Sequence, residues 1–134
     1  MEWDYEGLRL AEIFKQRPDW DMFRDGCPGG ENAAQVGERA DCVIERIRAI
    51  GGTVLLFSSG HFLRVLAARC LGLEPSAGRY FVLHTASFSA VGYEHDLSQP
   101  VIRLWNDDHD LAAIADKAQP VVGDGAIVQA GFGR

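Results

Sequence analysis

The clearest periodic pattern in the chain lies between Asn32 and Ile50, where apolar residues recur every three or four positions. This spacing is typical of an amphipathic helix with one buried face. Asn32 and Gln35 have the spacing of a capping box at its start, and Gly51 and Gly52 end it. The pattern therefore predicts a long helix that packs on a hydrophobic core along one side.

A strand, a tight turn and a second helix are predicted directly after this helix. Residues 53–57 (TVLLF) are apolar or β-branched, as in a buried strand, and residues 62–71 carry apolar positions at helical spacing. Between them, Ser58 and Ser59 are good N-cap residues, and the free N–H groups of a helix N-terminus can bind an anion. The turn is therefore either an anion site or a structural connection with a solvent-facing histidine, His61.

Weaker patterns flank this central unit. Near the start, they predict a short helix over residues 8–15 and a further apolar turn around residues 20–23. Residues 86–93 and 101–105 alternate enough to predict two strands. We expect these two strands to be antiparallel neighbours, because only a hairpin-like loop separates them.

The C-terminal part of the chain has the weakest pattern. Residues 111–117 predict one or two helical turns, and residues 112–134 as a whole are expected to be a weakly structured extension. Within it, Val121–Val122 and Ile127–Val128 either form a short added strand or stay loose. The chain as a whole, residues 1–134, is expected to form a single domain.

Composition limits the class of protein. The chain has 134 residues, of which 47% are hydrophobic and 24% charged, as in a soluble globular protein. A formal charge of −6 argues against a nucleic acid or a membrane surface as partner. No apolar stretch has the length of a membrane span, and the first residues do not resemble a signal peptide, so we expect a cytoplasmic protein.

The cysteines predict neither a disulfide framework nor a metal site. Cys27, Cys42 and Cys70 are widely spaced, and none belongs to a CxxC motif or a pairing with histidine. Free thiols are therefore expected, with Cys42 and Cys70 contributing to helix packing.

Four segments carry a resemblance to a known family: residues 2–8 (EWDYEGL), 28–31 (PGGE), 57–64 (FSSGHFLR) and 101–107 (VIRLWND). Together and in this order they resemble the histidine phosphatase superfamily, the phosphoglycerate-mutase-like enzymes, over residues 1 to about 111. The resemblance implies a three-layer α/β/α fold around a mostly parallel sheet with an antiparallel strand. It also implies phosphoryl transfer through a phosphohistidine, without a metal or another cofactor.

Part of the family's catalytic apparatus has no counterpart in this sequence. In the family, the nucleophile lies in an Arg-His-Gly motif at the end of the first strand. None of the four histidines here, His61, His84, His95 and His109, follows an arginine. The fold is therefore expected to be an incomplete version of the family's fold, without its first strand.

The matching segments also supply the candidate site residues. By resemblance, Glu2 takes the position of the family's proton donor, Ser59 that of its second histidine, and His61 that of a later, non-essential histidine. We therefore take Glu2 and His61 as candidate catalytic residues, and Ser59, Gly60 and His61 as candidate phosphate-binding residues. Glu31 is expected to be a helix-start carboxylate. Arg64 and Arg103 are expected to make surface or structural contacts.

These observations leave three functions open. The first is a family domain related to phosphomonoester hydrolases, with little or no activity alone because the nucleophilic histidine is absent and Ser59 replaces the second one. The second is an active phosphatase that uses His61 or a site supplied by a partner. The third is a non-catalytic anion-binding or oligomeric module. The expected ligand in each case is inorganic phosphate or a small phosphorylated molecule.

The missing strand also predicts an oligomer. In the family this strand lies in the middle of the sheet, so its loss should leave unpaired strand edges and an uncovered apolar face. Such edges pair readily with a second chain. We therefore expect a homodimer, with or without exchanged elements, or a requirement for a partner.

Overall fold

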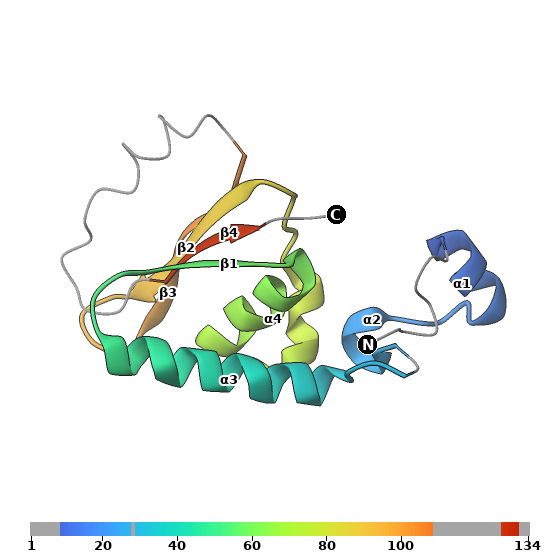
Figure 1. Ribbon diagram of the computed structural model, residues 1–134, viewed down its shortest axis with the longest axis horizontal. Coiled ribbons are helices and arrows are strands. Elements are labelled where there is room, and N and C mark those ends of the chain that lie inside the picture. The colour runs from blue at the N-terminus through green and yellow to red at the C-terminus, as the bar shows by residue number, and fades with distance from the viewer. Residues whose placement is uncertain (1–8, 28, 109–126, 132–134) are drawn as a thin grey trace.

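A computed structural model describes residues 9–27, 29–108 and 127–131, which form a four-stranded sheet with helices packed against it (Figure 1). In chain order the described elements are α1 (Leu10–Gln16), α2 (Met22–Asp25), α3 (Ala33–Ile50), β1 (Val54–Ser58), α4 (Gly60–Cys70), the 3₁₀ helix η1 (Pro75–Tyr80), β2 (Ser87–Tyr93), β3 (Pro100–Asp107) and β4 (Ile127–Gly131). The predicted order of α-helices and strands is thus confirmed as far as β3, and η1 is an additional short helix that the sequence pattern did not indicate.

Helices α3 and α4 lie together on one side of the sheet (Figure 1). The predicted capping box is present at the start of α3, where Asn32 Oδ1 accepts a hydrogen bond from the Gln35 N–H and Gln35 Oε1 accepts one from the Asn32 N–H, each at 2.9 Å. The inner face of α3 packs on α4, whose Leu63 and Leu66 are completely buried. The core therefore lies between these two helices and the sheet.

The sheet has the strand order β1-β4-β2-β3. Strands β2 and β3 are antiparallel, as predicted, and Tyr93 and Pro100 pair at the ends of their hairpin. Strand β4 runs parallel to β1 and antiparallel to β2. Among the described strands, the sheet is therefore mixed, and the mostly parallel sheet implied by the resemblance is not found. A short hairpin connection reverses the chain, which excludes a parallel pairing of β2 with β3.

The described helices that pack on the sheet cover one of its sides. Along β1, Val54 and Leu56 pack toward the core, whereas Leu55 alternates with them and is 51% exposed. The second helical layer of a three-layer fold is not present among the described residues. Of the expected three layers, the described residues therefore form two: the sheet and the helical layer on one of its sides.

Strand β4 occupies the middle of the sheet, between β1 and β2. Of the two alternatives left open for Ile127–Val128, the structure has the strand; Val121–Val122 and residues 111–117 lie outside the described residues. Residues 54–58 pair with residues 127–131, and the other edge of β4 pairs with β2. The unpaired central edges expected from the sequence are therefore filled by the chain's own last strand.

The cysteines are free, as predicted. Cys70 is buried in the core, and burial raises the pKa of its thiol to about 12. Cys42 lies on the exposed face of α3, so its expected role in helix packing is wrong. Across the described ranges, no helix is long and apolar enough to cross a membrane.

Candidate anion site at the start of helix α4

The candidate site lies in the turn between β1 and α4. Ser59 is the N-cap residue of α4 with extended backbone angles (φ −71°, ψ 152°), and its carbonyl accepts the first helical hydrogen bond from the Leu63 N–H at 3.0 Å. The Ser59 hydroxyl makes no capping hydrogen bond. Because the first N–H groups of a helix have no acceptor within it, those of Gly60 and His61 remain available to a ligand.

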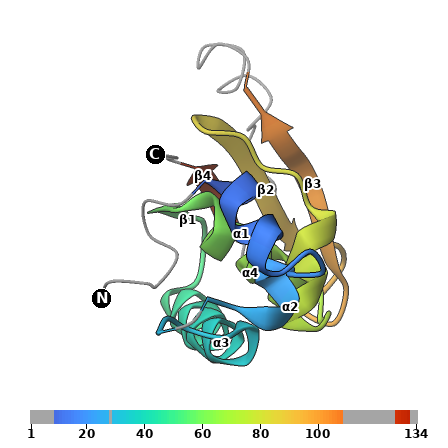
Figure 2. The ribbon, with the colours of Figure 1, turned by 90° about the vertical axis from the view of Figure 1, so that its right-hand side faces the viewer.

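A pocket of about 130 Å³ opens beside this turn. Its walls come from α2, the loop after α2, the start of α3 and the start of α4, and they include Phe23, Glu31, Arg39, Ser59 and His61. Figure 2 views the molecule from the side of α1 and α2, which lie nearest the viewer with the sheet behind them. The structure thus brings Ser59 and His61 together, with Gly60 between them, whereas Glu2 lies outside the described residues.

His61 lies beside an aromatic wall of the pocket, which is the ring of Phe23. The centroids of the two rings are 5.7 Å apart. Desolvation by the surrounding protein, and then the positive charge of Arg64, lower the pKa of His61 below its usual 6.5. At neutral pH, His61 is therefore an uncharged imidazole that can accept or donate a hydrogen bond.

Arg64 makes structural contacts, as the sequence predicted. Its Nε donates to the Gly78 carbonyl and its Nη2 to the Arg79 carbonyl, each at 3.0 Å. Its guanidinium also stacks 4.4 Å from the centre of the Phe23 ring. Since two backbone carbonyls and an aromatic face already hold Arg64, it acts on the site through its charge and by fixing Phe23.

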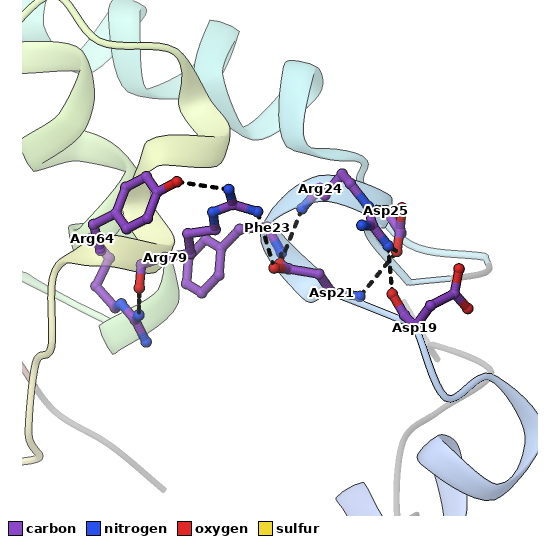
Figure 3. A network of polar contacts seen from close by, with 8 residues as sticks. Asp19, Asp21, Phe23, Arg24, Asp25, Arg64 and Arg79 are labelled. Carbon is purple, nitrogen blue, oxygen red and sulfur yellow. Dashed lines mark hydrogen bonds and ion pairs between the residues drawn. The ribbon is translucent and has the colours of Figure 1, made fainter.

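A polar network holds the aromatic wall in place (Figure 3). Asp21 caps α2 by accepting a hydrogen bond from the Phe23 N–H at 2.8 Å. On the other side, the Asp21 carboxylate lies 3.5 Å from Nη1 of Arg79, which belongs to η1 (Figure 3). The loop after α2 is closed by Trp20, whose Nε1 donates to the Gly26 carbonyl at 2.8 Å. These contacts fix the position of Phe23 relative to α4.

An ion pair lies across the pocket from α4. Arg39 Nη2 is 2.8 Å from Glu31 Oε2, and the Arg39 guanidinium lies 4.5 Å from the centre of the Phe62 ring. Glu31 directly precedes the N-cap residue of α3, as expected of a helix-start carboxylate. The pairing with Glu31 partly neutralises the charge that Arg39 brings to the pocket.

Two features near the site were not singled out from the sequence. The Leu83 carbonyl oxygen lies 3.8 Å from where a Cβ on Gly60 would be, so the turn that contains His84 borders the start of α4. His84 Nδ1 is 3.6 Å from Asp108 Oδ2. His84 precedes β2 and Asp108 follows β3. The hairpin pattern alone does not show that Leu83, next to His84, borders the start of α4.

The chemistry available at the site is that of oxyanion binding. The turn offers backbone N–H donors, a hydroxyl and an imidazole. Cys27 also lines the pocket, but burial raises the pKa of its thiol, so the reactive thiolate is disfavoured. Within the described ranges, no group of three or more histidine, cysteine, aspartate or glutamate side chains is placed to hold a metal ion.

The chain belongs to the histidine phosphatase superfamily (branch 1), whose family model matches residues 2–108. The α/β fold is accordingly related to the phosphoglycerate-mutase-like fold. A solved structure of an open reading frame product from Mycobacterium tuberculosis agrees, with a TM-score of 0.67, 29% identity, and coverage of 81% of this chain and 58% of that one.

Two relatives have phosphatase names. An acid phosphatase of Mycobacterium tuberculosis is 39% identical over 118 residues, covering 84% of this chain and 58% of the relative. A sedoheptulose 1,7-bisphosphatase of Saccharomyces cerevisiae is 36% identical over 93 residues, covering 54% of this chain and 34% of the relative. The chain thus spans little more than half the length of the first relative and about a third of the second.

Proposed function

We propose that this chain binds inorganic phosphate or a small phosphorylated molecule at the start of α4, and that it hydrolyses phosphate esters slowly or not at all by itself. The observation that carries the proposal is the Ser59-Gly60-His61 turn at the N-terminus of α4. By resemblance, Ser59 takes the position of the family's second histidine. Two N–H groups without an acceptor in the helix, and a hydroxyl without a capping bond, can donate hydrogen bonds to a phosphate there.

The residues of the chain support the low activity that we propose. Its 134 residues contain no Arg-His-Gly motif, and β4, which fills the middle of the described sheet, ends in Gln129-Ala130-Gly131. No described strand end therefore carries a histidine that follows an arginine. Losing a nucleophile and its partners together removes most of an enzyme's rate enhancement and leaves binding and residual electrostatics.

The relatives support the class of ligand. One is named as an acid phosphatase and the other as a bisphosphatase of a phosphorylated sugar. Both names concern proteins longer than this chain. A phosphoryl group is the feature that their ligands share, and it is the feature that the α4 turn suits.

A phosphate titration of the ¹⁵N-labelled chain tests this proposal. We expect the amide signals of Gly60 and His61 to shift, and Ser59→Ala and His61→Ala to weaken binding by roughly tenfold each, since a hydrogen bond to a charged group contributes about 1.5–3 kcal/mol. His95→Asn is the matched control, because His95 has a positive φ (65°) in the β2–β3 hairpin, a conformation that asparagine tolerates. Unshifted Gly60 and His61 signals would contradict the proposal.

A second candidate is an active phosphatase that uses His61. The lowered pKa of His61 favours this alternative, because a neutral imidazole is the form that attacks phosphorus. A phosphorylated His61, detected as an acid-labile label after incubation with a phosphate ester, would establish it. His61→Ala should then abolish the label, while Ser59→Ala should reduce it.

The homodimer stays a prediction. Its original reason, an unpaired centre of the sheet, does not hold where β4 is in place. However, β1 is an outer strand of the described sheet, and Leu55 on it is 51% exposed. Light scattering should give twice the mass of the chain; a monomer at all concentrations would contradict the prediction.

A further inference from the structure

Strand β4 is the only strand neighbour of β1 among the described residues. Val54 is opposite Ile127 and Ser58 is opposite Gly131 in the parallel pairing. On its other edge, β4 pairs with β2, where Ser87 is opposite Gly131. Strands β1 and β2 do not pair with each other, so β4 fills a slot between them.

The sequence position of β4 makes this slot unusual. Strand β4 is the last described element, and residues 108–126 connect it to β3. A connection of this length can reach either edge of the sheet or its middle, since an extended chain spans about 3.3–3.6 Å per residue. The connection therefore does not dictate the central position, and the pairing with β1 and β2 selects it.

Strands β1 and β2 both contact the described core through side chains of their own. The buried core described in the structure comes from α3, α4 and β2, and it contains Ile44, Leu63 and Val91. Strand β1 packs on this core through Val54 and Leu56 and continues into α4. When β4 leaves, β1 thus stays attached on its helical side, while its strand edge and that of β2 become free to pair.

We propose that β4 is a detachable strand, which the rest of the domain binds in the slot between β1 and β2 as it would bind an extended peptide. The ligand of the slot is the segment of residues 127–131. It forms parallel pairs on one edge and antiparallel pairs on the other, in the manner of strand addition to a sheet.

Occupation of the slot also affects the candidate anion site. Strand β1 ends at Ser58, one residue before the N-cap Ser59, and Ser58 is in register with Gly131. Release of β4 removes the strand partner that fixes this end of β1. This part of the inference rests on the proposed function. By linkage, phosphate and β4 then stabilise each other's binding by the same factor.

A proline variant of the full chain and a synthetic peptide test the proposal. Val128→Pro removes an N–H from the middle of β4 and should disfavour its pairing. A fluorescent peptide of residues 124–134 should bind this variant at least about ten times more tightly than it binds the unchanged chain, where the tethered β4 has an effective concentration on the order of mM. The matched control is the same peptide with Val128→Pro, which should not bind.

Equal binding of the peptide to both chains, or no binding to a folded Val128→Pro chain, would overturn the proposal. If that variant does not fold, hydrogen exchange on the unchanged chain decides. The β1 amides that bond to β4 should exchange through an opening that leaves the amides bonded between β2 and β3 protected. Exchange of both groups of amides only through global unfolding would overturn the proposal.

A phosphate titration, with and without the peptide, separates this inference from the proposed function. In the Val128→Pro chain, the peptide should restore the phosphate affinity of the unchanged chain. If peptide binding occurs but the unchanged chain does not bind phosphate, the proposed function fails and the detachable strand stands. If phosphate binds equally well with and without the peptide, the coupling to the anion site is wrong.

Discussion

Ser58, the last residue of β1, lies directly opposite Gly131, the last residue of β4, in the parallel pairing of these two strands. The residue after Ser58 is Ser59, the N-cap of α4 and the first residue of the candidate anion turn. The pairing with β4 therefore extends to the residue that directly precedes this turn.

The ring of His61 should titrate below its ordinary pKa of 6.5, because the protein around it, and then Arg64, disfavour the charged form. An NMR pH titration of the ring signals measures this pKa. Added phosphate should raise it, since an anion in the pocket favours the imidazolium. An unfolded sample in denaturant is the control, and a pKa at or above 6.5 in the folded, phosphate-free chain would contradict the described surroundings of His61.

The same shift predicts how stability depends on pH. Between the lowered folded pKa of His61 and its unfolded value of 6.5, the unfolded chain binds more protons than the folded one. The contribution of His61 to the free energy of unfolding therefore increases as pH rises through this window and becomes constant above it. Urea denaturation of the unchanged chain and of His61→Gln should show a difference that changes below about pH 6.5 and not above it.

Gly37→Ala should destabilise the protein although alanine favours helices. An added Cβ at Gly37 would clash with Pro75 Cγ, at the contact between α3 and η1. Overpacking of this kind costs about 1–3 kcal/mol, which exceeds the roughly 1 kcal/mol gained in helix propensity. Denaturant unfolding measures the difference. Adding Pro75→Ala removes the clashing Cγ and should restore part of the loss; a Gly37→Ala protein more stable than the parent would contradict the contact.

Leu63→Ala tests the core beneath the site. Leu63 is 0% exposed, so the substitution leaves a cavity and should lower the free energy of unfolding by about 2–5 kcal/mol. Leu97→Ala is the matched control, because Leu97 is 55% exposed and its truncation should change stability by less than about 0.5 kcal/mol. Equal effects of the two substitutions in thermal or urea unfolding would argue against the described packing of α4.

Local sequence signals predicted the elements whose structure depends on local interactions. The capping box of Asn32 and Gln35 and the apolar face of α3 are visible in any short window of the sequence, and so are the alternating strands of the β2–β3 hairpin. The Ser59-Gly60-His61 turn was found in the same way, because a strand followed by a helix defines its position.

Long-range pairing was not predictable in this way. The sequence allowed Ile127–Val128 a short added strand, but nothing local indicates that this strand lies between β1 and β2. The contribution of Phe23 to the wall beside His61 depends on the Asp21–Arg79 contact between α2 and η1, which also joins distant segments. Contacts of this kind arise from packing of the whole domain, which no periodicity records.

The rate of p-nitrophenyl phosphate hydrolysis by the purified chain at neutral pH tests the central claim most directly. The claim is that the α4 turn binds a phosphoryl group without cleaving its ester. We predict that p-nitrophenyl phosphate shifts the Gly60 and His61 amide signals of the unchanged chain. We also predict that the unchanged chain releases p-nitrophenol no faster than the His61→Ala variant does. Hydrolysis that turns over repeatedly and is lost in His61→Ala would contradict the account.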